Sequence, residues 1–219
     1  MSVPPSDRTT VRRKSDRGRY DEETVWAILD EGLVCHVGVC TDLGPVVVPT
    51  AYARSGDTLY LHGARANAVL GAATGKPVCV TVTLVDGLVL ARSAFNHSMN
   101  YRSVVIFGIA HEVTDPARKR GALTDFVEHV APGRAPGTRE PTDAELRATL
   151  VLSLPLVESS AKVRIGPPVD DEADLDLPHW AGVIPLTTVA GAPLPDERSA
   201  GLAVPDHAAA WRRPEHAGS

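Results

Sequence analysis

The chain has 219 residues, of which 43% are hydrophobic and 22% charged, and this length and composition predict one domain with poorly ordered ends. Its formal net charge of −5 gives no overall electrostatic reason to bind nucleic acid or an anionic membrane surface. No apolar run is long enough to cross a bilayer, and the basic N-terminus lacks the apolar segment of a secretory signal, so we expect a cytoplasmic protein.

The N-terminal half opens with a polar, basic arm, residues 1–19, which we predict to be flexible. Acidic residues from Asp21 onward and apolar residues at Val25, Ile28 and Leu29 predict a short amphipathic helix that ends at Gly32. Val-rich segments separated by turn residues then predict strands at 33–40, 46–54, 58–62, 77–84 and 88–95, with an Ala-rich helix at 64–74.

The C-terminal half contains a sixth predicted strand at 103–111 and a helix at 115–130, which starts with Asp115 and Pro116. A capping box from Thr142 to Glu145 predicts a further short helix. Apolar runs predict strands at 150–157, 161–165 and 180–186, and the tail from 189 to 219 is rich in Ala, Pro and Gly, which predicts a loosely ordered segment.

Six or seven short strands with two or three helices, and no repeated alternation of strand and helix, favour an antiparallel barrel over a doubly wound sheet. We therefore predict a mainly β domain with peripheral helices over residues 20–188.

The sequence contains no GxGxxG, GxxxxGKS/T, HExxH or GxSxG pattern, which argues against Rossmann-type binding, nucleoside triphosphate hydrolysis, zinc proteolysis and serine hydrolysis. Three cysteines, Cys35, Cys40 and Cys79, lie in strand-like segments without metal-ligand spacing, so we interpret them as buried reduced thiols. We predict no metal site.

The segment LHGARAN, residues 61–67, ends a predicted strand at Gly63 and enters a helix with Arg65 at its start. Free N–H groups, small residues and a guanidinium at that place are suited to a phosphate. A simple turn with a solvated arginine is the alternative interpretation.

The segment HSMNYRS, residues 97–103, is almost entirely polar but leads directly into the apolar run VVIF. This pattern indicates the wall of a polar ligand site at a barrel mouth, with a solvent-exposed loop as the alternative. Lys162 and Arg164 share one face of a strand and either line that site or balance the acidic loop 170–176. Four histidines, His36, His62, His97 and His111, have no evident partner carboxylate and suit core or pocket-wall positions better than metal ligation.

The chain resembles the pyridoxamine-5′-phosphate-oxidase-like flavin-nucleotide-binding proteins, in the branch that also contains nitroimidazole-resistance reductases. The resemblance extends from Tyr20 to Leu186 and rests on VVVPTAYAR, LYLHGA, FNHSMNYRSVVIFG and the SAKVRIG segment. It implies a split β-barrel that forms a homodimer, with two FMN molecules in grooves between the subunits.

The resemblance also implies the residues that bind the cofactor. The isoalloxazine ring would lie along Val48, Pro49, Thr50 and Tyr52, and the phosphate would be held by His62, Gly63, Ala64, Arg65 and Asn67. The groove would be closed by Tyr101, Arg102 and Ser103, with Lys162 and Trp180 reaching it from the partner subunit.

One position departs from the family pattern. Many relatives carry His where this chain has Asn96, and an amide cannot change charge near neutral pH as an imidazole can. The residues that hold the substrate of true pyridoxamine-phosphate oxidases are also not recognisable, so vitamin B6 oxidation is not the expected function.

Three functional interpretations follow from the resemblance. The first is an FMN-dependent oxidoreductase that acts on a small molecule, with hydride exchange at flavin N5 and Arg102 or His97 orienting the substrate. The second is a non-catalytic flavin-binding or carrier protein. The third keeps the barrel but binds haem or the deazaflavin F420, with His36, His62 or His97 as a possible axial ligand.

Overall fold

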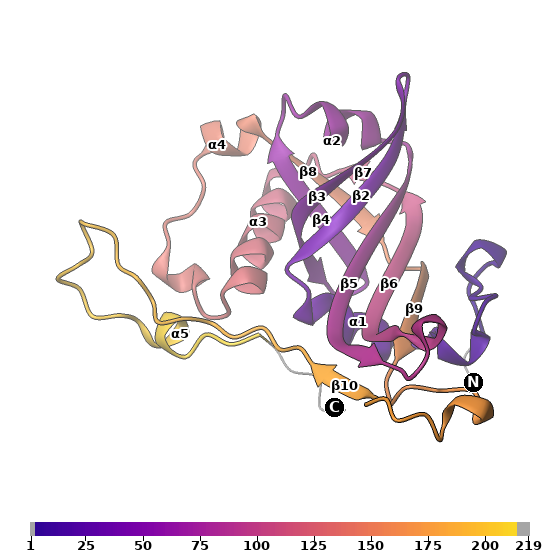
Figure 1. Cartoon of the computed structure of the whole chain (residues 1–219). Coiled ribbons are helices and arrows are strands. Elements are labelled where there is room, and N and C mark those ends of the chain that lie inside the picture. The colour runs from indigo at the N-terminus through magenta and orange to yellow at the C-terminus, as the bar shows by residue number, and fades with distance from the viewer. Residues whose placement is uncertain (1–2, 214–219) are drawn as a thin grey trace.

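The computed structural model describes residues 3–213, and these form one antiparallel ten-stranded sheet with helices at its edges (Figure 1). The long strands are β2 (Val34–Thr41), β3 (Gly44–Ser55), β4 (Thr58–Ala64), β5 (Pro77–Leu90), β6 (Ser98–Ile109), β8 (Thr149–Pro155) and β9 (Glu158–Arg164). Three shorter strands, β1 (Gly18–Arg19), β7 (His111–Glu112) and β10 (Gly182–Pro185), lie at the margins.

The strands follow the order β1-β9-β6-β5-β2-β3-β4-β8-β7, and β10 pairs with β5. Within the described residues the end strands β1 and β7 do not pair with each other, so the sheet curls into an open barrel rather than a closed one. The mainly β, split-barrel prediction is therefore confirmed, although the structure contains more strands than the six or seven expected.

Side chains that alternate along the strands fill the interior of the barrel. Val37, Val80, Val104 and Ile106 come from neighbouring strands and are completely buried. The helix α1 (Glu22–Glu31) packs Val25, Ile28 and Leu29 into the same core. Its first turn is capped by Asp21, which accepts a hydrogen bond from the Thr24 N–H at 2.9 Å.

The helix α3 (Pro116–Val130) covers the outer side of β3, β4 and β8. Phe126 and Ala122 of α3 contact Tyr60, Ala53 and Val151, which forms a second apolar cluster. The remaining helices are short: α2 (Ala68–Ala73), α4 (Asp143–Ala148) and α5 (Asp206–Ala209). No helix in the described part of the chain has the length and hydropathy needed to span a bilayer.

Two sequence predictions were wrong in detail. The strands predicted at 77–84 and 88–95 are a single strand, β5, because Asp86 and Gly87 form a register irregularity opposite β6 rather than a turn. The polar segment 97–103 belongs largely to strand β6, which begins at Ser98 instead of 103. Its side chains therefore alternate between the two faces of the sheet.

The N-terminal arm, defined here as residues 3–19, lies along β6 and β9. Gly18 and Arg19 pair with Lys162 and Ala161 of β9, and Arg8 forms an ion pair with Glu158. Residues 1 and 2 fall outside the described residues. The prediction that the arm is flexible remains a prediction, but the structure gives it specific contacts.

The tail runs from β10 away from the barrel and returns through α5, as the yellow segment in Figure 1 shows. It is attached on its return by Trp211, whose indole N–H donates to the Val130 carbonyl, and by Arg213, whose Nε donates to the Glu31 carbonyl, each at 2.8 Å. Residues 214–219 fall outside the described residues.

Candidate functional site

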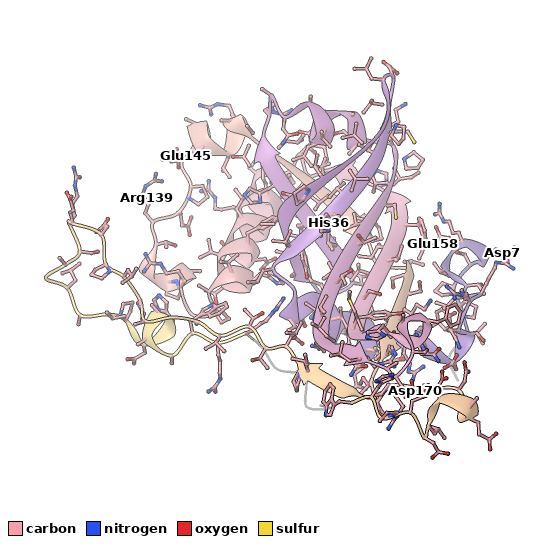
Figure 2. All side chains as sticks on the ribbon, in the orientation of Figure 1. Asp7, His36, Arg139, Glu145, Glu158 and Asp170 are labelled. Atoms are coloured by element: carbon pink, nitrogen blue, oxygen red, sulfur yellow. The ribbon has the colours of Figure 1, made fainter. Side chains whose placement is uncertain are left out.

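A continuous row of side chains crosses the outer face of the sheet. It runs over five adjacent strands, β3, β2, β5, β6 and β9. Cross-strand pairing places Pro49 beside His36, His36 beside Thr81, Thr81 beside Val105, and Val105 beside Ser160. His36 is exposed near the middle of the sheet (Figure 2). We call this row the outer-face row.

Strand alternation divides the predicted flavin-contact residues into two sets. Pro49, Tyr101, Ser103 and Lys162 lie on the same side of the sheet as the outer-face row. Val48, Thr50, Tyr52 and Arg102 alternate with them and direct their side chains to the interior. The second set can contribute to a ligand on the outer face only through backbone groups.

Tyr52 is a core residue. Its ring is completely buried, and its hydroxyl donates to the Leu29 carbonyl at 2.5 Å. Burial raises the pKa of Tyr52 well above the usual tyrosine value. The hydroxyl therefore joins β3 to α1, and it does not face the outer surface.

Arg102 is also held inside, between two carboxylates. Its Nε and one terminal nitrogen donate to Asp86 at 3.0 and 2.7 Å, and its guanidinium also pairs with Glu31, with one bond at 2.8 Å. Hydrogen bonds to Asp86 and then to Glu31 raise the pKa of Arg102. In this arrangement Arg102 ties α1 to β5 and β6, and its charge is already neutralised.

The predicted phosphate segment lies where β4 ends and α2 begins. Asn67 caps α2 and accepts the N–H groups of Val69 and Leu70 at 3.0 and 3.1 Å, so those donors are not free. Arg65 is more than half exposed, forms an ion pair with Glu112, and donates from Nε to the Arg147 carbonyl at 3.3 Å. The cationic part of the predicted anion site is thus present, whereas the Val69 and Leu70 N–H groups are used by the cap.

Three further predicted residues lie close to this segment. His62 is half-buried and packs edge-on against Phe126, with ring centroids 4.1 Å apart. Its Nδ1 is buried without a hydrogen-bond partner among the described residues, and burial lowers the pKa of this imidazole. Gly63 lies where an added Cβ would be 2.8 Å from Leu70 Cδ1, and Ala64 is exposed.

Lys162 and Ser103 meet on the outer face of the sheet, on strands β9 and β6, away from the end of β4. Lys162 Nζ donates to the Arg13 carbonyl of the N-terminal arm at 3.1 Å, and Ser103 Oγ lies 3.4 Å from the Lys162 carbonyl. Trp180 precedes β10 and is 68% exposed, with its ring against the backbone of Gly182. One chain therefore distributes the predicted site residues over three separate places.

Two features of the structure were not predicted from the sequence. One is the N-terminal arm as a wall against β6 and β9, for which the basic run Arg12-Arg13-Lys14 was the available signal. The other is an apolar cavity of about 830 Å³ between the end of α3 and the tail, lined in part by Leu33, Val130 and Trp211. Cys40 is exposed and Cys79 is half-buried, so the prediction that all three thiols are buried holds only for Cys35.

The described residues contain no group of three or more His, Cys, Asp or Glu side chains suited to a metal ion. Residues 21–163 match the family model described as pyridoxamine 5′-phosphate oxidase. The chain belongs to this family. The sequence-based recognition is confirmed, and family membership accounts for the open antiparallel barrel.

Two solved structures resemble nearly the whole chain. The flavocytochrome Anf3 from Azotobacter vinelandii is 42% identical, with a TM-score of 0.92, and the match covers 97% of this chain and 100% of that one. The FAD and haem binding protein from Mycobacterium smegmatis is 37% identical, with a TM-score of 0.83, and the match covers 87% and 95% of the two chains.

A third structure, a putative 5-nitroimidazole antibiotic resistance protein from Bacteroides thetaiotaomicron, is 26% identical, with a TM-score of 0.57 and coverage of 67% and 86%. A search of the curated proteins finds no match. The two more similar structures extend beyond the family model and include the N-terminal arm or the tail, since their coverage exceeds residues 21–163.

Proposed function

We propose that this protein is a flavin-binding redox protein that carries FAD together with haem and acts as an oxidoreductase on a small molecule. The observation that carries the proposal is 42% identity to a flavocytochrome over 97% of the chain. The FAD and haem binding protein from M. smegmatis supports the same pair of cofactors. FMN, the cofactor implied by the first resemblance, is the alternative flavin.

The outer-face row provides the surface for the flavin ring. It combines a rigid proline, Pro49, with apolar Val105 and polar His36, Thr81 and Ser160, and flavin sites need such a mixture of flat contact and hydrogen bonding. Bound flavin supplies electron or hydride transfer, and the chain positions the ring and limits its contact with water. No side chain on this row has to act as a catalytic acid or base.

A second copy of the chain would complete the groove. Ile184, Leu88 and Met99 are cross-strand neighbours on β10, β5 and β6, and Ile184 and Met99 are 44% and 51% exposed. Phe95, just before β6, is 92% exposed. Contiguous exposed apolar side chains favour a protein interface, so we propose the homodimer that the family resemblance implies.

Among His36, His62 and His97, His62 is the best suited to hold haem iron. Its buried Nδ1 has no partner among the described residues, and its lowered pKa favours the neutral imidazole that binds metals. His97, by comparison, places Nδ1 2.9 Å from the Ser93 carbonyl, and His36 is exposed on the outer-face row. We therefore assign the axial ligand to His62.

The haem assignment is tested by His62→Ala, with His111→Ala as the matched control because His111 is exposed. Both variants should be produced with added haem precursor and compared by absorption spectroscopy. We expect the Soret band to be lost or strongly shifted in His62→Ala and retained in the control. An unaltered Soret band in His62→Ala would reject His62 as the ligand.

The flavin phosphate assignment is tested by Arg65→Ala. Removing a guanidinium that binds phosphate costs about 1.5–3 kcal/mol, which corresponds to roughly tenfold to hundredfold weaker flavin binding. The measurement is fluorescence titration of apoprotein, with dimer mass checked by light scattering. Unchanged flavin affinity would place the phosphate elsewhere.

Anaerobic reduction separates an enzyme from a carrier. An oxidoreductase should have its flavin bleached by a physiological class of donor, such as NADH, NADPH or reduced F420. Failure of all three donors to reduce the flavin would support the second interpretation, a flavin-binding or carrier protein.

A further inference from the structure

A second cavity lies between the N-terminal arm and the sheet. Its volume is about 320 Å³, within the range of small-ligand sites. Arm residues 8–13 form one wall, and the opposite wall is formed by Ser103, Val105, Phe107, Ser160 and Lys162 of β6 and β9. We call it the arm cavity. Val105 and Ser160 also belong to the outer-face row, so the cavity adjoins the surface assigned to the flavin ring.

The arm is attached at several points along this wall. Arg8 Nε donates to Glu158 at 3.1 Å, and its guanidinium lies 5.0 Å from the centroid of the Phe107 ring. Figure 2 shows Glu158 beside the N-terminal segment that carries Asp7. The Val11 N–H donates to the Tyr20 hydroxyl at 2.9 Å, and Lys162 Nζ donates to the Arg13 carbonyl at 3.1 Å. These contacts hold the arm in place, so that it forms one wall of the cavity.

The charge lining the arm cavity has one sign. Arg8, Arg12, Arg13 and Lys162 line it, and no carboxylate does. Glu158 neutralises Arg8, and Arg12 is 3.9 Å from the fully exposed Asp7. Arg13 and Lys162 have no carboxylate partner among the described residues. Ser103 and Ser160 add hydroxyl donors, so the lining suits an oxyanion.

We propose that the arm cavity binds the phosphate or diphosphate group of a small ligand, with Arg12 and Arg13 of the arm and Lys162 of β9 as its cationic contacts. One source of this group is the diphosphate of bound FAD, and that assignment rests on the proposed function. The other source with the same chemistry is a separate phosphorylated ligand that reaches the flavin face. In both cases the arm is part of the ligand site.

The test compares Arg12→Gln/Arg13→Gln and Lys162→Gln with the control Arg118→Gln/Arg198→Gln. The arm double variant and the control each remove two positive charges from exposed positions, and the control lies outside the arm cavity. Affinities of the full-length apoprotein for FAD, FMN and inorganic pyrophosphate are measured by isothermal titration calorimetry. A melting temperature near that of the wild type verifies folding.

If the FAD diphosphate occupies the cavity, the arm and Lys162 variants should bind FAD at least about tenfold more weakly, and FMN, whose phosphate is one half of that diphosphate, should also bind more weakly. If a separate ligand occupies it, both flavins should bind normally and pyrophosphate binding should fall by a similar factor. Wild-type affinities for all three compounds in these variants, or equal losses in the control, would overturn the proposal. A wild-type protein that binds pyrophosphate but neither flavin would reject the proposed function and leave the arm cavity supported.

Discussion

At the scale of single residues, strand alternation decides which predicted site residues can touch a ligand. The run Val48 to Tyr52 was predicted as one contact surface, but only Pro49 and Ala51 have their side chains on the outer face. Tyr52 instead hydrogen-bonds Leu29 in the core. The sequence located strand β3, because its Val-rich pattern is local. The face of the sheet on which each side chain lies depends on the register of β3 with β2.

Tyr52→Phe tests the structural role of that hydroxyl. Loss of its hydrogen bond to Leu29 leaves a buried carbonyl without this partner and should lower the free energy of unfolding by about 1–2 kcal/mol. Flavin affinity should not change. Tyr60→Phe is the control, since no hydrogen bond involves the Tyr60 hydroxyl in the described residues. Urea denaturation with flavin titration measures both quantities, and weaker flavin binding with normal stability would contradict the core assignment.

Arg102→Met tests whether Arg102 is an internal ion-pair residue or a groove residue. Its removal leaves the buried Glu31 and the partly buried Asp86 without their cation, which should destabilise the fold by about 3 kcal/mol. Replacing all three charges, with Glu31→Gln and Asp86→Asn added, should recover part of that loss. Thermal unfolding of the single and triple variants is the measurement. A stable single variant with impaired substrate turnover would instead support the groove role.

Two half-buried histidines, His62 and His129, predict a pH dependence of stability. Burial lowers the pKa of His62 and of His129, whose Nε2 is 2.7 Å from the Gly32 carbonyl. Below the ordinary value of 6.5 the unfolded chain binds more protons than the folded one, so stability should fall as pH decreases from 6.5 toward each folded-state pKa. Above 6.5 both histidines are neutral in either state, and their effect vanishes.

The measurement is the free energy of unfolding of apoprotein between pH 7.5 and about pH 5, which brackets the ordinary histidine pKa. His62→Gln/His129→Gln should flatten this profile relative to wild type. A steep profile retained in the double variant would show that other groups dominate the window.

At the scale of elements, two variants of Asn67, the N-cap of the short helix α2, distinguish a capping role from a phosphate-binding role. Asn67→Ala removes the cap from Val69 and Leu70 and should cost about 1 kcal/mol, whereas Asn67→Asp keeps a good cap and adds negative charge. If Asn67 contacts the flavin phosphate, the Asp variant should fold normally and bind flavin weakly. Normal flavin affinity in a stable Asn67→Asp protein would restrict Asn67 to capping.

Helices and strands could be predicted where neighbouring residues in the sequence determine them. Alternating valines located β2 and β3, and Asp115 with Pro116 located the start of α3. Prediction failed at Asp86-Gly87, because the residues that favour a turn also occur at irregularities within a continuous strand. It also missed the contacts of the arm, since the Arg8 to Glu158 pair joins positions 150 residues apart.

At the scale of the whole molecule, one chain leaves the site residues in separate places. Arg65 and His62 lie at the end of β4, whereas Ser103 and Lys162 lie at the arm cavity. The proposed homodimer would account for this separation if each groove took one set from each copy, with the row of Ile184, Leu88 and Met99 as its apolar contact. Such completion between copies cannot be inferred from the composition of one chain.

The cofactor content of the purified protein shows whether it binds FAD together with haem. The protein is produced with added riboflavin and haem precursor, and its bound cofactors are released and identified by mass spectrometry alongside an absorption spectrum. We expect FAD and haem in near-equal amounts, one of each per chain, with both flavin absorption and a Soret band. A protein that retains neither cofactor, and binds neither on reconstitution, would contradict it.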